Sequence, residues 1–170
     1  MMERGQTPDV VALRARWPWW LALLFCLAGL VLSILLEQIH FKLHTNPTFH
    51  SFCAIDRKVN CDIVARSPYA VLLGAPVAAW GIFGYVLAAV VSLWGAFSRK
   101  PLLAAGCALH LAILFLASSA AFGLVSAFLV TAVCILCLAT YGANLLFLVS
   151  VLLAGRSVGL RAALAEPWRF

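Results

Sequence analysis

Long apolar blocks separated by short polar segments dominate the pattern of this chain. The first block runs from about Trp19 to Ile39, and its ~20 residues, rising 1.5 Å each, match a ~30 Å hydrocarbon core. A second block covers about Val71 to Phe97. The stretch from Leu102 to Gly155 carries no charge and is too long for one span, so it predicts two helices. We place them at about 102–125 and 131–155, with a turn near 126–130 and a tail over 156–170.

This division predicts an all-α integral membrane protein with a single domain over residues 1–170. Its fold is a four-transmembrane-helix bundle, with a polar cysteine loop over 41–68 between the first two helices. The alternative for the first block is a signal peptide, since basic residues precede it. The block is longer than such a peptide, however, and it is followed by Glu37-Gln38-Ile39-His40 instead of a small-residue cleavage site. We therefore expect a retained span.

The composition supports a membrane location. Hydrophobic residues make up 65% of the 170 residues and charged residues only 11%, whereas soluble domains have about 45–50% and 25%. The excess apolar surface must face lipid, which excludes a soluble enzyme. The net charge of +6 does not indicate a nucleic-acid-binding protein, because the basic residues are spread thinly between apolar blocks and form no stripe.

The distribution of basic residues predicts the orientation. Four spans put both termini on one side, together with eight basic residues: Arg4, Arg14, Arg16, Arg99, Lys100, Arg156, Arg161 and Arg169. The other side has Lys42, Arg57, Lys58 and Arg66. Because cytoplasmic segments are enriched in Lys and Arg, we expect cytoplasmic termini in an inner (cell) membrane. The 41–68 loop and the start of the fourth helix then face the periplasm or exterior.

Four of the six cysteines fall on that predicted outer side, where disulfides persist. Cys53 and Cys61 lie in the loop. Cys134 and Cys137 lie at the start of the fourth helix, on one face and close enough to bond. A helix N-terminus favours a thiolate, the nucleophile of disulfide exchange. This pattern predicts a redox relay, with four cysteines still allowing three pairings. Cys26 and Cys107 lie within spans, where we expect packing roles.

Polar groups follow the second cysteine pair at membrane depth. Thr140 and Tyr141 add hydroxyls and Asn144 adds an amide, so a small aromatic electron acceptor dissolved in the bilayer fits there. Other roles remain open for the same residues. A Cys-x-x-Cys pair can form half of a zinc site, but here it has no second pair. The loop pair is also compatible with a structural staple. His40 and His44 share a helical face and form a possible metal pair, although our prediction is no metal.

Two motifs resemble the vitamin K epoxide reductase family, and its bacterial branch most closely. The first is Cys53-x7-Cys61 followed by Ser67-Pro-Tyr69-Ala70 and Gly74-Ala-Pro76-Val-Ala-Ala-Trp80-Gly81. The second is Cys134-Ile-Leu-Cys137-Leu-Ala-Thr140-Tyr141-Gly-Ala-Asn144, which matches the family pattern C-x-x-C-x-x-[TS]-Y-x-x-N. The likeness covers about residues 20 to 150, and the motifs agree in order and topology.

The resemblance implies a chemistry. Bacterial members are similar in role to DsbB: they reoxidise a thioredoxin-fold, DsbA-like protein and pass the electrons to a membrane quinone. Carried onto this chain, Cys53 and Cys61 take electrons from the partner, Cys134 exchanges with Cys61, and Cys137 faces the quinone. The resemblance also implies quinone contacts at Ser67 and Tyr141, to which we add Trp80 and Asn144. The quinone is ubiquinone or menaquinone. A dithiol in water cannot reach a lipid-soluble acceptor, so two disulfide pairs at different depths suit the task.

Two departures from the family shape the expectation. Many bacterial relatives carry a fused thioredoxin-like domain after the last span, whereas this sequence ends at Phe170, so we expect the periplasmic partner to be a separate protein. Where the vertebrate branch has an Asn-containing segment, this chain has Ala78-Ala79-Trp80-Gly81. A thiol:quinone oxidoreductase is therefore our main hypothesis. The alternatives are a vitamin K quinone or epoxide reductase and a non-catalytic membrane scaffold or metal-binding protein with a stapled loop.

Overall fold

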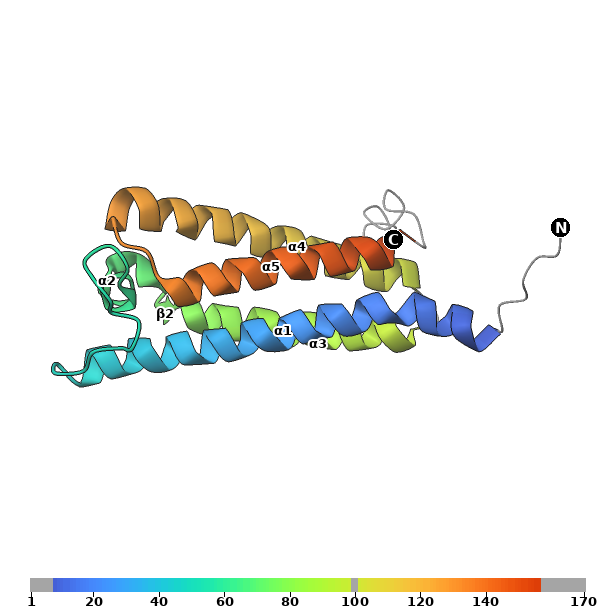
Figure 1. Ribbon diagram of the computed structural model, residues 1–170, viewed down its shortest axis with the longest axis horizontal. Helices are drawn as coiled ribbons and strands as arrows, with labels where there is room; N and C mark the ends of the chain where they lie inside the picture. Colours follow the sequence, from blue (N-terminus) through green and yellow to red (C-terminus); the bar gives the residue numbers. More distant parts are fainter. Residues whose placement is uncertain (1–7, 99–100, 157–170) are drawn as a thin grey trace.

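Four long helices lie side by side in the computed structural model, which describes residues 8–98 and 101–156 (Figure 1). Helix α1 packs mainly against α3 and α5, whereas α4 packs against α5 and, less closely, α3. All four contain segments long and apolar enough to cross a membrane. The protein is thus an all-α membrane bundle, as the hydropathy pattern predicts. The helices are α1 (Pro8–Thr45), α3 (Val77–Phe97), α4 (Pro101–Leu124) and α5 (Ile135–Gly155).

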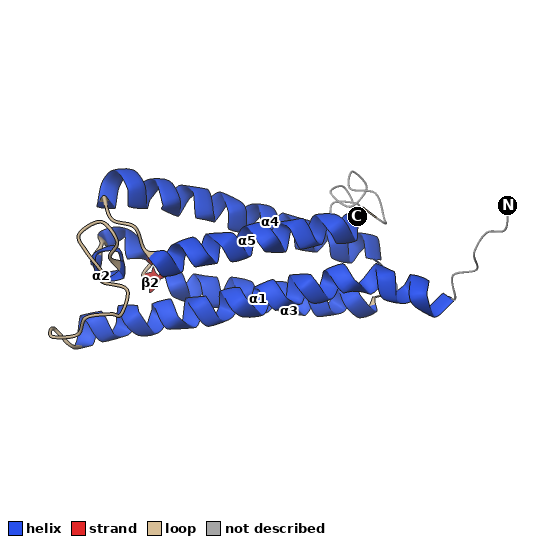
Figure 2. Ribbon diagram, viewed as in Figure 1, coloured by secondary structure: helices blue, strands red, loops and turns tan. Residues whose placement is uncertain are grey.

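Short elements gather at one end of the bundle, which we call the cysteine end (Figure 2). There the chain between α1 and α3 forms a loop, two short helices and a two-stranded hairpin. The elements are α2 (Cys61–Arg66), the 3-10 helix η1 (Pro68–Ala70), β1 (Val71–Leu72) and β2 (Ala75–Pro76). The start of α1 and the end of α5 lie together at the opposite end, as an even number of spans requires.

The first helix continues past the predicted limit at Ile39 and ends at Thr45. Ile39 and Leu43, one turn apart on the same face, are buried against the cysteine cluster at this end. The last carbonyl groups are satisfied locally, because the Thr45 hydroxyl donates to the carbonyl of Phe41. Tertiary packing therefore extends the helix into a segment that hydropathy alone treats as loop.

The second membrane helix begins at Val77, six residues later than the predicted start at Val71. Residues 71–76 form the hairpin of β1 and β2 instead, with Leu72 paired to Ala75. Its two turn residues, Leu73 and Gly74, have φ values of 53° and 82°. Two consecutive positive φ values are typical of a type I′ hairpin turn. Leucine is rarely found in this conformation, so the sequence gives no standard turn signal here.

The turn predicted near residues 126–130 is displaced toward α5. Helix α4 continues into the π-helical segment η2 (Val125–Val130), and the chain reverses at Thr131, whose φ is 58°. The Ser126 hydroxyl donates to the carbonyl of Ala132, which ties the reversal back to η2. Residues 131–134 consequently precede α5, and Cys134 caps that helix instead of lying inside it.

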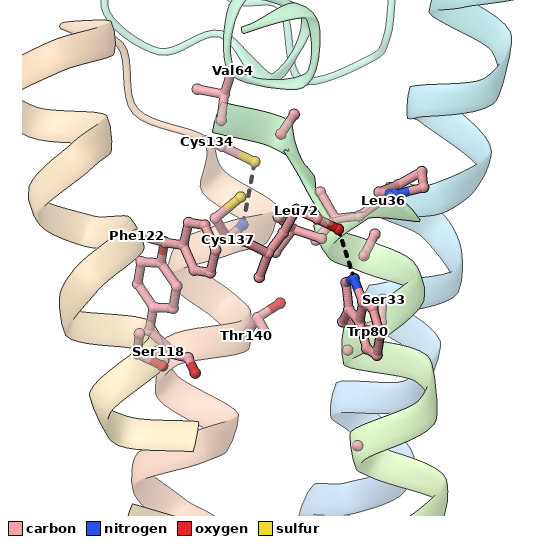
Figure 3. A pocket seen from close by; sticks show the side chains of 18 of the residues that line it. Ser33, Leu36, Val64, Leu72, Trp80, Ser118, Phe122, Cys134, Cys137 and Thr140 are labelled. Carbon is pink, nitrogen blue, oxygen red and sulfur yellow. Dashed lines mark hydrogen bonds between the residues drawn. The ribbon is translucent and has the colours of Figure 1, made fainter. Parts of the chain in front are cut away.

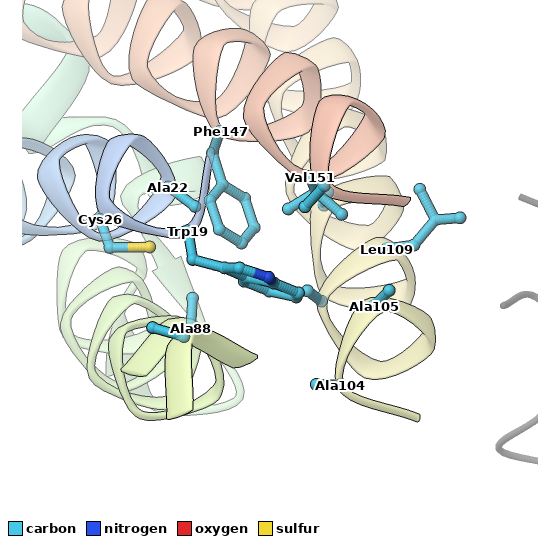
Figure 4. Close-up of a cluster of buried hydrophobic side chains, with 13 residues drawn as sticks. Trp19, Ala22, Cys26, Ala88, Ala104, Ala105, Leu109, Phe147 and Val151 are labelled. Atoms are coloured by element: carbon cyan, nitrogen blue, oxygen red, sulfur yellow. The ribbon is translucent and has the colours of Figure 1, made fainter. Parts of the chain in front are cut away.

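The main apolar core lies away from the cysteine end and is built around one indole ring (Figure 4). Trp19 of α1 is buried there, and its ring lies so close to Gly95 of α3 that any side chain at that position would collide with it. Many partners are alanines, which allow close helix approach. Cys26 is also in this core, 4.0 Å from the Ser92 hydroxyl. This core orients the helices that carry the cysteines.

Candidate redox site

The two loop cysteines form a disulfide. Cys53 lies in the loop and Cys61 is the first residue of α2, and both are almost completely buried. Asn60 caps α2, because its side-chain oxygen accepts the N–H groups of Asp62 and Ile63. The cap fixes where the helix starts and thereby where the Cys61 sulfur points. Of the pairings that the sequence left open, the structure has Cys53–Cys61.

Main-chain hydrogen bonds join the loop to the segment before α5. The Val133 N–H donates to the carbonyl of Lys58 at 2.7 Å, and the Asn60 N–H donates to the carbonyl of Val133 at 2.9 Å. These bonds connect residues immediately before Cys61 to the residue immediately before Cys134. The two cysteines are thus brought together by backbone pairing between segments more than seventy positions apart.

Cys134 meets the loop disulfide through its sulfur. Its Sγ lies 3.4 Å from Sγ of Cys61 and accepts the N–H of Cys137 at 3.3 Å, in the manner of a helix N-cap (Figure 3). A hydrogen bond from the Cys137 thiol, and further ones from the N–H groups of Cys137 and Leu136, hold the pKa of the Cys134 thiol below its ordinary value. Burial opposes this effect. The result is a sulfur disposed to be a thiolate beside a disulfide.

A buried carboxylate covers the loop side of the disulfide. Both oxygens of Asp62 lie 3.2 Å from the Ser51 N–H, and His50 Nδ1 lies 3.5 Å from the same carboxylate. The Ser51 hydroxyl in turn lies 3.3 Å from Sγ of Cys53. These contacts, which we call the Asp62 clamp, hold the chain before Cys53 against α2. The signal in the sequence was the pair Asn60 and Asp62 at a helix start, but it does not reveal the partner.

A cavity of about 500 Å³ lies directly beneath the cysteines. Its walls come from all four long helices and from the α2–β2 segment, and most of them are apolar. Cys61, Cys134 and Cys137 all contribute to its lining. Figure 3 shows Cys137 on the cavity side of Cys134, with Phe122, Ser118 and Thr140 nearby. The cavity thus has sulfur at one end and membrane-depth apolar walls elsewhere, which suits a flat, lipid-soluble molecule.

All four residues expected to contact a quinone line this cavity, but with different hydrogen-bonding capacity. Trp80 already donates its indole N–H to the carbonyl of Leu72 at 3.0 Å, so only its ring is available. Ser67 donates its hydroxyl to the carbonyl of Val64 at 2.7 Å and retains only acceptor capacity. Tyr141 makes no hydrogen bond through its hydroxyl within the described part of the chain.

Asn144, the fourth of them, is held in a polar network between three helices. Its Oδ1 accepts the Tyr85 hydroxyl of α3 at 2.6 Å, and its Nδ2 donates to the Ser119 hydroxyl of α4 at 2.8 Å. The Tyr85 ring packs directly on Gly29 of α1, where a Cβ would collide with it. Both ends of the amide are therefore engaged in joining helices at the depth of the cavity. Sequence reasoning missed Tyr85 because its neighbours are all apolar.

The histidines expected as a possible metal pair do not gather further ligands. The rings of His40 and His44 lie 4.3 Å apart, but His44 Nδ1 is 2.8 Å from the carbonyl of His40. Within residues 8–98 and 101–156, no three His, Cys, Asp or Glu side chains are grouped so as to hold a metal ion. His40 also lines the cavity, a position that the sequence did not indicate.

The chain matches a known protein family. The model of the vitamin K epoxide reductase family matches residues 14–152, which include α3 and α4, most of α1 and α5, and all four cysteines of the site. No curated protein matches the chain significantly.

Proposed function

The chain belongs to the vitamin K epoxide reductase family, and on that premise we propose that it is a DsbB-like thiol:quinone oxidoreductase. Membership of the family implies a membrane oxidoreductase that uses thiol and quinone chemistry. The finer proposal is that this chain oxidises a separate thioredoxin-fold, DsbA-like protein and thereby drives disulfide formation. The observation that carries it is the contact between two sulfurs at an apolar cavity. Sγ of Cys134 lies 3.4 Å from Sγ of Cys61, one end of the Cys53–Cys61 disulfide, and both residues line the cavity.

The first proposed step is exchange with the partner. Two thiols of the partner reduce the Cys53–Cys61 disulfide, leaving a partner disulfide and two loop thiols. The exchange proceeds through a mixed disulfide between the partner and one loop cysteine, as thiol–disulfide exchange requires. The Asp62 clamp shields Cys53 in the closed loop, so docking of the partner has to displace it. Small thiols gain no such docking energy, so they should reduce the shielded disulfide slowly.

The second proposed step transfers the electrons inward. A Cys61 thiolate attacks Cys134 of an oxidised Cys134–Cys137 pair, forming a Cys61–Cys134 bond and releasing Cys137. Cys53 then attacks Cys61 and restores the loop disulfide, which leaves Cys134 and Cys137 reduced. The redox state of the structure, with Cys53–Cys61 bonded and the other two cysteines free, corresponds to the product of this step. Because Cys134 is stabilised as a thiolate, it is a good leaving group when Cys53 attacks the Cys61–Cys134 disulfide.

The cavity is where we place the quinone. Apolar walls and a volume of about 500 Å³ fit a quinone head group, and Cys137 lies at the wall. A bound quinone would supply a two-electron acceptor for the cysteine pair. We assign to Tyr141 a hydrogen bond from its hydroxyl to a quinone oxygen, and to Trp80 a wall for the ring. Ser67 would accept a hydrogen bond from a hydroxyl of the quinol product, whereas Asn144 positions the helices around the head group.

We assign the cysteine end to the outside of the cell membrane. The basis is the excess of Lys and Arg in the segments at the other end. A thioredoxin-fold oxidase works in an oxidising compartment, where structural disulfides form, so the orientation and the proposed activity agree. Labelling of intact cells with a membrane-impermeant amine reagent at Lys58, against Lys100 as the opposite-side control, tests the assignment.

The decisive experiment is anaerobic quinone reduction by the purified protein with a reduced DsbA-like partner, followed by quinone absorbance. We expect reduction by wild type and loss of activity in the alanine variants of Cys53, Cys61, Cys134 and Cys137. Cys107→Ala is the matched control, since Cys107 does not line the cavity. A parallel run with vitamin K epoxide and a chemical dithiol tests the alternative reductase. The proposal is contradicted if the wild type reduces neither ubiquinone nor menaquinone, or if the Cys137→Ala variant remains active.

A further inference from the structure

Three titratable side chains at the cysteine end of α1 have no part in the sulfur relay. Glu37, His40 and His44 recur at intervals of three and four residues and therefore share one helical face. His44 is exposed to solvent, and its ring lies 4.3 Å from that of His40. His40 is half-buried and lines the cavity that also contains Cys134 and Cys137. The row thus leads from solvent to the cavity wall.

Glu37, the deepest of the three, has an unmet hydrogen-bonding requirement. Its Oε2 is buried and has no hydrogen-bond partner within the described residues. The carboxyl group nevertheless interacts electrostatically with His40, one turn further along the helix. Burial of an unpaired carboxylate oxygen is costly, and the cost falls when the group carries a proton or faces a cation. A proton on His40 therefore lowers the cost of burying the Glu37 oxygen.

The chemistry of the proposed function requires a proton at this place. Closure of the Cys134–Cys137 disulfide from one thiolate and one thiol releases two electrons and one proton. Reduction of a quinone to the quinol consumes two electrons and two protons. Because Cys134 is the sulfur that the structure stabilises as a thiolate, the cysteine pair supplies both electrons but only one proton. The second proton has to reach the cavity by a route that does not involve sulfur.

We propose that His40, backed by Glu37, delivers this second proton into the cavity and is reprotonated from solvent through His44. The inference rests on the proposed function. The imidazole also interacts with the backbone of Ala65 in α2, which orients the ring. Its two nitrogens let it give up a proton on one side and regain one on the other. In each turnover His40 gives up one proton and regains one, so the protein is unchanged.

The surroundings of His40 offer no competing charged donor among the described residues that line the cavity. From α2 and η1 they contribute Cys61, which is in the disulfide, and Tyr69. From α3 and α5 they contribute Tyr85, Cys134, Cys137 and Tyr141. Lys42 follows His40 by two residues in α1, and its ammonium group lies over the Phe49 ring, 5.6 Å from the ring centroid. Among the described residues that line the cavity, His40 is the one histidine.

The test uses prereduced protein mixed with quinone in a single turnover, with absorbance of the quinone and of a pH indicator recorded together. We expect His40→Gln to slow both signals at alkaline pH, on the order of tenfold or more, and less in mild acid. Added imidazole should restore the rate. Exchange with the partner should remain at the wild-type rate, which shows that the variant is folded. His110→Gln, a histidine in α4 outside the cavity lining, is the matched control.

A second measurement needs no quinone. Infrared spectra of the quinone-free protein give the frequency of the Glu37 carboxyl band, identified by its absence in Glu37→Gln. We expect His40→Gln to shift that frequency, whereas an unchanged frequency means that the two side chains do not interact. An unchanged rate and pH profile in His40→Gln would overturn the proposal while leaving the thiol:quinone activity intact. A wild type that reduces no quinone would instead contradict the proposed function.

Discussion

The sulfur of Cys134 approaches the loop disulfide at Cys61, whereas the sulfur of Cys53 is next to the Ser51 hydroxyl, at 3.3 Å. The two ends of one disulfide therefore have different neighbours. Cys61 faces the helix that carries the second cysteine pair, and Cys53 faces the loop that a partner would displace. This asymmetry supports the proposal that Cys61 makes the inner exchange, the role that the family resemblance implied.

The first prediction concerns the bond between the two pairs. A Cys53→Ala/Cys137→Ala variant keeps Cys61 and Cys134, whose sulfurs lie 3.4 Å apart. Mild oxidation should join them nearly completely, because little movement is needed to reach bonding distance. Peptide mapping by mass spectrometry without reduction detects the link. The control is Cys53→Ala/Cys134→Ala, which leaves Cys61 with Cys137 and should cross-link more slowly. Equal yields in both variants would contradict the arrangement.

The second prediction concerns the thiolate. Hydrogen bonds from the thiol of Cys137 and from main-chain N–H groups lower the pKa of Cys134. A thiol with a lowered pKa remains ionised at pH values where an ordinary cysteine is protonated, and it loses its charge only when the pH falls through the lowered pKa. Ultraviolet thiolate absorbance, taken as the difference between wild type and Cys134→Ala, measures this. Cys137→Ala should move the transition back toward higher pH, and an unmoved transition counts against the stated cause.

The third prediction concerns the Asp62 clamp. Asp62→Ala removes the acceptor of the Ser51 N–H and leaves that buried group unpaired. The free energy of unfolding should fall by about 1–3 kcal/mol, and the loop disulfide should react faster with a small thiol such as glutathione. Thermal melts in detergent and reduction kinetics provide the two readouts. Asp56→Ala is the control, because this exposed carboxylate bonds only N–H groups of its own turn. Similar reduction rates in both variants would show that the clamp shields nothing.

The fourth prediction concerns the network between helices. Tyr85→Phe removes the hydroxyl that donates to Asn144 and leaves a buried amide oxygen without its donor. The free energy of unfolding should fall by about 1–2 kcal/mol, which is the upper part of the range for hydrogen bonds between membrane helices. Tyr69→Phe is the comparison, since that side chain is exposed near the cavity mouth. A melting temperature for Tyr85→Phe equal to that of Tyr69→Phe would exclude a structural role for the network.

The hydropathy pattern was sufficient for the number and order of the spans, because lipid imposes length and apolarity on each helix. It was insufficient at their ends. Tertiary packing of Ile39 and Leu43 prolongs α1, and a hairpin with Leu73 at positive φ delays α3. Neither effect is visible in composition. Of the predicted tail over 156–170, residues 157–170 lie outside the described residues.

The cysteines were predictable from their spacing and from the family pattern, whereas their polar neighbours were not. Trp80 and Asn144 were expected as ligand contacts, but the structure commits the indole N–H and both ends of the amide to other groups of the protein. The sequence-based prediction assigned no role to Asp62 or Glu37. Their significance depends on which main-chain group or imidazole they meet in space, and a single sequence does not contain that information.

The backbone pairing between Asn60 and Val133 has a consequence for how this site tolerates change. Since main-chain atoms form both bonds, almost any side chain at positions 58, 59 and 133 preserves the spacing of the sulfurs. An insertion or a deletion has a different effect. The number of residues between each main-chain hydrogen bond and the next cysteine determines the position of that cysteine's sulfur. One residue inserted between Val133 and Cys134 would turn the thiol toward another side of α5. The distance between the two sulfurs is therefore set by the number of residues in each segment more than by the side chains at these positions.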